Sequence, residues 1–275
     1  MTHHREALAE LMRRPQEEID LAYAALLIAR ERYPDLDIEA SIAKLDEIAA
    51  AIRAQLKSSA GPPKILQAIN AYLFEELGFR GNEDEYYDPA NSFLNEVIDR
   101  RIGIPITLSI VYMEVAKRLG LELRGVGLPG HFLVKYARRE GEVVIDPFGG
   151  GAVLSARELR ERIAQMGGSP ELASRYLAAV TKRQIITRML NNLKQIYISS
   201  SAFDEALGIS ELILAVNPWD LDEIRDRGLV QSKRNAYAEA LRDLETYMQY
   251  RPEAEDAAQV RENIQALRPR VSGQE

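Results

Sequence analysis

The amino-acid sequence predicts a predominantly helical α+β protein with one small antiparallel sheet, followed by an all-α helical repeat domain. Three observations support this prediction. Apolar residues recur at helical spacing through most of the chain, three short strand-like runs lie between residues 121 and 146, and two C-terminal segments align at a spacing of 34 residues. We therefore expect an α+β domain over residues 1–180 and a helical repeat domain over residues 181–275.

The composition is that of an ordinary globular protein of about two domains, by the usual prior of ~150 residues each. Of the 275 residues, 46% are hydrophobic and 28% are charged, which excludes a disordered or fibrous chain. The net charge is −7 with the two signs interspersed, so nucleic acid is not an expected partner. The N-terminal segment MTHHREALAELMRR lacks the apolar core of a signal peptide, and no apolar run reaches the ~18 residues of a membrane span. The expected location is cytoplasmic, with no membrane partner.

Helical periodicity covers residues 15–33, 38–56, 65–77 and 92–101 in the first half of the chain. Asp37 is a suitable N-cap for the second of these helices, because its side chain can accept a hydrogen bond from an unpaired backbone N–H. These helices are expected to be structural.

The segment FRGNEDEYYDPA, residues 79–90, interrupts the helical pattern with two adjacent tyrosines among carboxylates. A run of charges is typical of a solvated loop, here with tyrosines covering the edge of the core. The alternative is a lip beside a binding pocket, because loops often carry binding residues.

The central helix is predicted to begin at Pro105 and to end before Gly120, since Pro favours the first helical position and Gly the position past the end. Its apolar residues cover nearly the whole circumference, so the helix is expected to be buried.

Three strands of a small antiparallel sheet are predicted after this helix, at Leu121–Val126, His131–Tyr136 and Val143–Asp146. A hairpin turn across residues 137–142 would place Asp146 roughly opposite Leu133 and within two or three positions of His131. An imidazole and a carboxylate can therefore meet at one end of the sheet, near the start of the central helix.

Past the sheet, Ser155 and Glu158 form a predicted capping box for a helix that ends near Met166. A further short helix is expected from Pro170 to Ala179.

The segments NSFLNEVIDRRIGIPITLSIVYMEVAKRLGL, GVGLPGHFLVKY and IDPFGGG resemble the SirB-type family, in which a transglutaminase-like half is followed by tetratricopeptide repeats. The resemblance implies a core like that of the papain-like Cys-His-Asp enzymes. It matches His131 and Asp146 to the imidazole and carboxylate positions and places the nucleophile position near Pro105 to Thr107. The chain contains no cysteine, so thiol chemistry is excluded.

A binding pocket is expected around this pair, with the start of the central helix and His131 facing an anionic or carbonyl-bearing group. No cofactor and no metal is expected, because two of the three histidines are His3 and His4 near the N-terminus. The candidate pocket residues are Asn95, Glu96, Pro105, Thr107, Tyr112, Gly130, His131, Phe132 and Asp146.

Two functions remain open at this stage. A hydroxyl of Thr107 or Ser109, activated by His131 and Asp146, would make the protein an amide or ester hydrolase or acyl-transferase. Alternatively, each hydroxyl bonds the carbonyl one turn back, and the histidine and aspartate are a satisfied polar pair. The second interpretation is favoured and predicts a non-enzymatic interaction or regulatory protein.

The C-terminal segments AFDEALGISELILAVNP, residues 202–218, and AYAEALRDLETYMQYRP, residues 236–252, align without a gap. Their spacing is the length of a tetratricopeptide repeat, so repeats are predicted at about 187–220 and 221–254. A helix over residues 181–199 would begin the first repeat, and residues 255–268 would cap the second. The expected partner is a protein or peptide that binds these repeats.

Overall fold

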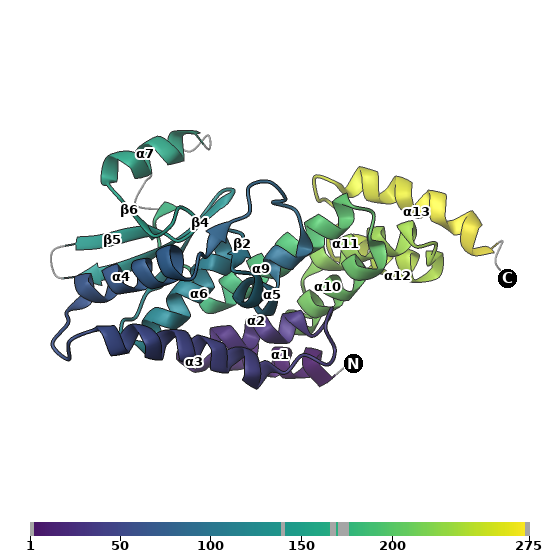
Figure 1. The fold of residues 1–275 in the computed structure, drawn as a ribbon. Helices are drawn as coiled ribbons and strands as arrows, with labels where there is room; N and C mark the ends of the chain where they lie inside the picture. The colour runs from purple at the N-terminus through teal and green to yellow at the C-terminus, as the bar shows by residue number, and fades with distance from the viewer. Residues whose placement is uncertain (1–2, 139–140, 166–168, 170–175, 273–275) are drawn as a thin grey trace. The chain divides into compact units, whose positions relative to one another are not determined.

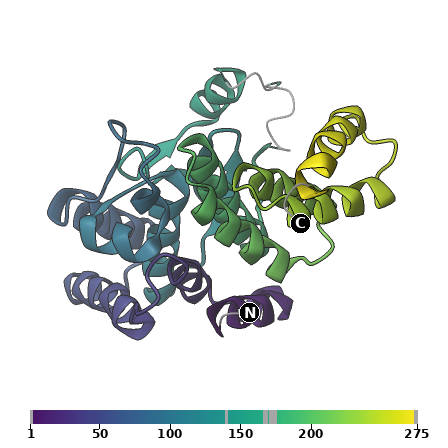
Figure 2. The same ribbon diagram turned by 90° about the vertical axis from the view of Figure 1, so that its right-hand side faces the viewer.

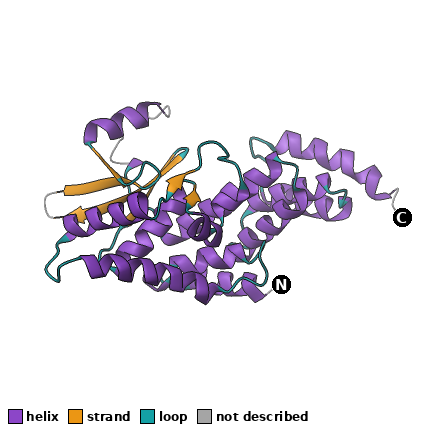
Figure 3. Cartoon of the chain, in the orientation of Figure 1, coloured by secondary structure: helices purple, strands orange, loops and turns teal. Residues whose placement is uncertain are grey.

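The computed structural model of the chain describes residues 3–138, 141–165, 169 and 176–272, and it is predominantly helical with small sheets, as predicted (Figure 1, Figure 3). The chain divides into two compact units, one of residues Pro15–Met189 and one of Met1–Arg14 with Leu190–Glu275. The domain division at residue 180 remains our proposal.

The first helices of the larger unit are α2 (Leu21–Ala29), α3 (Ile38–Gln55) and α4 (Pro62–Asn70). The helix expected over residues 15–33 is shorter than predicted, because a 3-10 turn at Gln16–Glu18 precedes α2. The side chain of Asp20 accepts a hydrogen bond from the backbone N–H of Tyr23, and with this N-cap α2 begins as a separate helix.

The predicted cap of α3 forms, since the side chain of Asp37 accepts a hydrogen bond from the backbone N–H of Ala40 at 3.0 Å. After α4 the chain continues as a π-helical segment at Ala71–Glu76. Two short strands, β1 (Arg80–Gly81) and β2 (Ile102–Gly103), then pair in parallel on either side of α5 (Leu94–Arg100). Strands of two residues are too short to leave a pattern in the sequence.

The central helix α6 (Pro105–Arg118) is buried almost all round, as its composition predicts. Ile110, Val111 and Val115 are 0–1% exposed. Gly120 follows the helix with a φ of +85°, a left-handed conformation that glycine adopts without steric cost. The helix therefore occupies the middle of the larger unit.

The antiparallel sheet has four strands in the order β3 (Arg124–Leu128), β4 (His131–Arg138), β5 (Gly141–Asp146) and β6 (Ala152–Leu154). The first strand was predicted at residues 121–126 but begins at Arg124. Leu121 and Leu123, whose apolar character suggested a strand, are buried in the segment before it. The three-residue β6 was not predicted from the sequence.

The two faces of this sheet are covered by different helices (Figure 1, Figure 2), with α7 (Ala156–Gln165) on one face and α4 and α6 on the other. On the α7 face, Leu159 and Ile163 pack against Leu133 and Val144. The predicted end of this helix at Met166 lies outside the described residues, as does most of the helix expected over residues 170–179.

The smaller unit contains the predicted repeats. Its helices are α9 (Lys182–Ser199, of which residues 190–199 belong to this unit), α10 (Phe203–Val216), α11 (Leu221–Lys233), α12 (Tyr237–Tyr250) and α13 (Ala257–Ser272). The two repeats also share a backbone conformation, since Ser201 and Asn235, at equivalent positions, have φ values of 60° and 62°.

The helix α13 packs on the second repeat through a cluster that includes Leu244, Tyr247, Val260 and Ile264. It therefore covers the C-terminal end of the array, as expected for a capping helix.

The N-terminal helix α1 (His3–Arg13) belongs to the same compact unit as the repeats. It packs against α10, buries Leu8 and Met12, and forms an ion pair between Arg5 and Glu211. Nothing in the helical pattern of residues 3–13 indicates a partner so distant in sequence.

Candidate functional site

His131 and Asp146 meet at one end of the four-stranded sheet. Nε2 of His131 lies 3.0 Å from Oδ1 of Asp146. The paired positions Val134 and Ile145 place Asp146 opposite Leu133 on the same face as His131, because side chains alternate along a strand. The carboxylate side chain is 2% exposed and the imidazole 13%, so the pair is nearly enclosed.

A third group, Arg162 of α7, also contacts this pair. Its guanidinium donates to Oδ2 of Asp146 at 2.5 Å, and the backbone N–H of Gly149 donates to Oδ1 at 3.1 Å. Burial alone would raise the pKa of Asp146, but the hydrogen bonds from His131, Arg162 and Gly149 hold it below its usual value. Asp146 is therefore an ionised carboxylate at neutral pH.

Two groups face Nε2 of His131, Oδ1 of Asp146 at 3.0 Å and Nη1 of Arg162 at 3.3 Å. A carboxylate only accepts hydrogen bonds and is the nearer group, so in a neutral ring this contact favours the tautomer with the proton on Nε2. Nδ1 then has a free lone pair and makes no hydrogen bond to any residue that the structure describes. The ring therefore offers one acceptor atom to a ligand.

Aromatic side chains extend from His131 toward the loop of residues 79–90. The ring centroid of Phe148 lies 5.8 Å from that of His131, and Tyr86 lies 6.3 Å from Phe148. The adjacent Tyr87 is 75% exposed. These contacts support the interpretation of this loop as a lip beside the site.

The loop is held in place by the side chain of Asn91, which is 0% exposed. Its Nδ2 donates to the backbone carbonyl of Glu85 at 2.7 Å, and its Oδ1 accepts from Asn82. The conformation of this loop is therefore fixed by side-chain hydrogen bonds.

The structure does not bring either candidate hydroxyl to the imidazole. Oγ of Thr107 donates to the backbone carbonyl of Asn91 at 2.7 Å, and it also accepts from the backbone N–H of Ile104. Oγ of Ser109 contacts the carbonyl of Phe132 at 3.4 Å. Both residues are 0% exposed, and no hydrogen bond within the described residues joins either to His131. The geometry does not support a hydroxyl nucleophile.

Comparison with known proteins agrees with this geometry. A family model described as the transglutaminase-like superfamily matches residues 39–191, and a tetratricopeptide repeat model matches residues 193–265. The chain belongs to the transglutaminase-like superfamily.

Several relatives share nearly the whole chain. A UPF0162 protein of Xylella fastidiosa strain Temecula1 is 40% identical over 90% of each chain, and a UPF0162 protein of Vibrio cholerae is 25% identical over 91% of this chain and 93% of its own. F-box only protein 21 of Mus musculus is 31% identical over 64% of this chain and 27% of its own. No solved structure matches the chain.

Four of the residues predicted to line the pocket of the transglutaminase-like half lie elsewhere or are enclosed. Asn95 is 8% exposed, and its Oδ1 has no hydrogen-bond partner among the described residues. Glu96 lies beside Tyr33, whose pKa is raised by burial and by the charge of Glu96. Pro105 and Thr107 are buried in the first turn of α6.

Tyr112 and Phe132, two further candidate pocket residues, are enclosed in the structure. Phe132 is 1% exposed and follows His131 in the strand, so the two side chains point to opposite faces. Tyr112 is 0% exposed, and its hydroxyl donates to Asn70 instead. The aromatic ring that contacts His131 is that of Phe148. The sequence signal that could have indicated this contact is the IDPF segment, which contains Phe148.

The turn between β3 and β4 is held from the opposite face by Arg188 of α9. Its guanidinium donates to the carbonyls of Leu128 and His131 at 2.7 and 2.8 Å and lies 5.5 Å from the ring centroid of Phe132. Gly130, in this turn, has a φ of +67°. Arg188 thereby fixes the backbone from which the imidazole projects.

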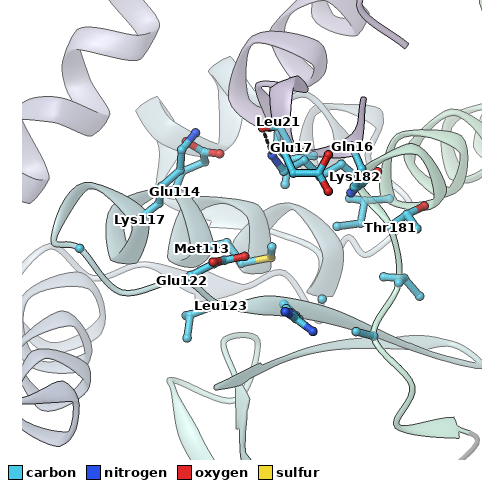
Figure 4. A pocket seen from close by; sticks show the side chains of 16 residues that line it. Gln16, Glu17, Leu21, Met113, Glu114, Lys117, Glu122, Leu123, Thr181 and Lys182 are labelled. Carbon is cyan, nitrogen blue, oxygen red and sulfur yellow. Dashed lines mark hydrogen bonds and ion pairs between the residues drawn. The ribbon is translucent and has the colours of Figure 1, made fainter. Parts of the chain in front are cut away.

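Two cavities of the transglutaminase-like half lie apart from this pair. One, of about 700 Å³, is bordered by α6, by Gln16 and Glu17 and by the start of α9 (Figure 4). One of the carboxylates that line it, Glu114, is paired with Arg118 at 2.6 Å. The other, of about 750 Å³, lies between α4 and the sheet. Neither is lined by His131 or Asp146.

Proposed function

We propose that the protein is a non-catalytic interaction protein, in which the transglutaminase-like half offers a ligand site and the tetratricopeptide repeats bind a partner protein. The observation that carries this proposal is the repeat unit itself, since two repeats and a capping helix form a helical array of the kind that binds peptides and helices.

Exposed aromatic residues in the repeat unit support a role in protein binding. Trp219 is 77% exposed and Tyr250 is 55% exposed. Trp and Tyr are the residue types that most often dominate the energy of protein interfaces. We propose that these two side chains contact the partner.

The His131 site supports binding over turnover. It combines an ionised carboxylate, a guanidinium and an imidazole acceptor, but the chain has no thiol, and both nearby hydroxyls are bonded to backbone groups. Such a site suits a ligand with a hydrogen-bond donor for Nδ1 and a carbonyl or anionic group for Arg162. We propose Arg162, in place of the start of the central helix, as the partner of the anionic or carbonyl group.

Two finer points belong to the same proposal. We propose that the protein is a SirB-type member of its superfamily. We also propose that it acts in the cytoplasm. None of the helices that the structure describes is long and apolar enough to cross a membrane.

The test is affinity capture by the full chain, compared with two variants. The Trp219→Ala, Tyr250→Ala double variant removes the exposed aromatics of the repeat unit, whereas Tyr87→Ala removes an equally exposed ring of the other unit. Truncation of an interface hot spot costs about 2 kcal/mol or more, so partners retained by the wild type should be lost from the double variant only. Equal retention by all three proteins, measured by quantitative mass spectrometry, would contradict the proposal.

A further inference from the structure

Asn70, the last residue of α4, connects two parts of the transglutaminase-like half that are distant in sequence. Its Oδ1 accepts a hydrogen bond from the hydroxyl of Tyr112 at 2.8 Å, and its Nδ2 donates to the backbone carbonyl of Gly151 at 2.8 Å. The π-helical segment Ala71–Glu76 begins at the next residue, and such segments are frequent at functional sites.

The orientation of the Asn70 amide follows from its two partners. A backbone carbonyl only accepts, so the NH₂ group must face Gly151 and the oxygen must face Tyr112. Burial raises the pKa of Tyr112, which keeps its hydroxyl protonated as a donor. Both ends of the amide are therefore engaged, and a flipped amide would set its oxygen against the carbonyl of Gly151 and lose that hydrogen bond.

Gly151 in turn belongs to the turn that carries Asp146. Its backbone N–H donates to the backbone carbonyl of Asp146 at 2.8 Å, and the N–H of Gly149 donates to the carboxylate of Asp146 at 3.1 Å. The φ of Gly151 is +78°, and a Cβ at this position would lie 2.3 Å from Oδ1 of Asn70. Asn70 thus contacts one end of a turn whose other end holds the carboxylate.

We infer that Asn70 is a positioning residue of the His131 site. It holds the turn of residues 146–151 in the conformation in which the carboxylate of Asp146 meets Nε2 of His131 at 3.0 Å. This inference rests on the proposed function only in treating the His131–Asp146 pair as the ligand site. The chain of hydrogen bonds from Tyr112 to Asp146 is made by protein groups alone.

The experiment is nitrogen NMR of the imidazole rings in the full chain, which has three histidines. In the wild type, His131 should show the tautomer with the proton on Nε2, and this proton should be visible because Asp146 protects it. In Asn70→Leu and in Gly151→Ala, the Nε2 proton signal should be lost, and both ring nitrogens should shift toward the average of the two tautomers.

Gly150→Ala is the matched control for Gly151→Ala. Gly150 also has a positive φ, +68°, but nothing lies within 4 Å of a Cβ placed there. The backbone strain is therefore similar in the two variants, while the collision with Asn70 occurs only in Gly151→Ala. The control should keep the wild-type nitrogen signals of His131.

The inference fails if Asn70→Leu and Gly151→Ala lower the stability but leave the His131 signals unchanged, since the role of Asn70 is then purely structural. If Asn70→Leu does not fold, Tyr112→Phe decides, because it removes only the donor to Asn70; wild-type His131 signals in that variant would overturn the inference. Partner capture by the repeat unit tests the proposed function separately: its loss or retention in the Trp219→Ala, Tyr250→Ala variant does not depend on the His131 signals.

Discussion

The two compact units bury charge in different ways. In the repeat unit, buried ion pairs join different helices: Nζ of Lys194 in α9 lies 2.5 Å from Glu223 and 2.9 Å from Asp226 in α11. In the transglutaminase-like half, Glu114 pairs with Arg118 of its own helix α6, and the buried carboxylate of Asp146 pairs with His131 and Arg162 at the end of the sheet.

This difference indicates two uses of buried charge. Arg227 of α11 also forms a two-pronged pair with Asp243 of α12, both N···O distances being 2.7 Å. Helices in an array can slide past one another, and a buried ion pair is satisfied in one register only. We interpret the ion pairs of the repeat unit as contacts that fix the register of its helices. We interpret the cluster of Asp146, His131 and Arg162 as a ligand site.

The largest expected effect is that of Lys194→Met in the repeat unit. It leaves Glu223, which is 4% exposed, without its cation, and breaking a buried pair in this way typically costs about 3–5 kcal/mol. The free energy of unfolding from urea titration measures the loss.

Two controls sharpen this prediction. The double variant Lys194→Met, Glu223→Met removes both charges and should recover much of the loss, because an apolar pair of similar size fills the same space. Arg234→Ala breaks the exposed pair with Asp204, whose side chain is 81% exposed, and should cost no more than about 1 kcal/mol. Equal losses for the buried and exposed pairs would refute the comparison.

Asp146→Asn should have the second-largest effect on stability. The amide keeps a hydrogen-bond acceptor for His131 or Arg162 but loses the charge that both hydrogen bonds use, for a cost of about 1–3 kcal/mol. Thermal or urea unfolding gives the difference, and the transition should stay cooperative. A gain in stability would mean that the wild-type pair is strained for function.

The two units should also respond to pH at opposite ends of the scale. Burial would lower the pKa of Lys194, but hydrogen bonds to Glu223 and Asp226 raise it above its usual value of 10.5. A raised lysine pKa contributes stability that is complete below the unfolded pKa and is lost as the pH rises through the folded value. Asp146 has a lowered pKa, so its contribution is present above 3.8 and is lost as the pH falls through the folded value.

The measurement is stability against pH for the wild type and the two single variants. The difference between wild type and Lys194→Met should shrink above pH 10.5, and the difference between wild type and Asp146→Asn should shrink below pH 3.8. Differences that do not change with pH would contradict the assigned pairs.

The smallest expected effect is that of an activated ester. Incubation with p-nitrophenyl acetate should leave no acyl adduct on Thr107 or Ser109, because both hydroxyls are 0% exposed and bonded to backbone carbonyls. Intact-mass and peptide mass spectrometry test this directly. An adduct on either residue that is absent from His131→Ala would restore the hydrolase interpretation.

The fold was predictable from the sequence where periodicity or spacing determines it. The buried helix, the repeats and the register that pairs His131 with Asp146 follow from local patterns, because strand pairs can be counted outward from a hairpin turn. Arg162 and Asn70 were missed because both lie on helices whose docking on the sheet depends on tertiary packing. A three-residue strand such as β6 is likewise stabilised by its neighbours.

The position of α1 has a consequence for synthesis of the chain. Its apolar residues Leu8, Leu11 and Met12 leave the ribosome well before α10, against which the helix packs and which begins only at Phe203. At about 5–20 residues per second, roughly 190 further residues take about 10–40 s to add. During that interval the apolar face of α1 has no native surface to cover it. We therefore expect the apolar face of α1 to need protection from aggregation until α10 has been made.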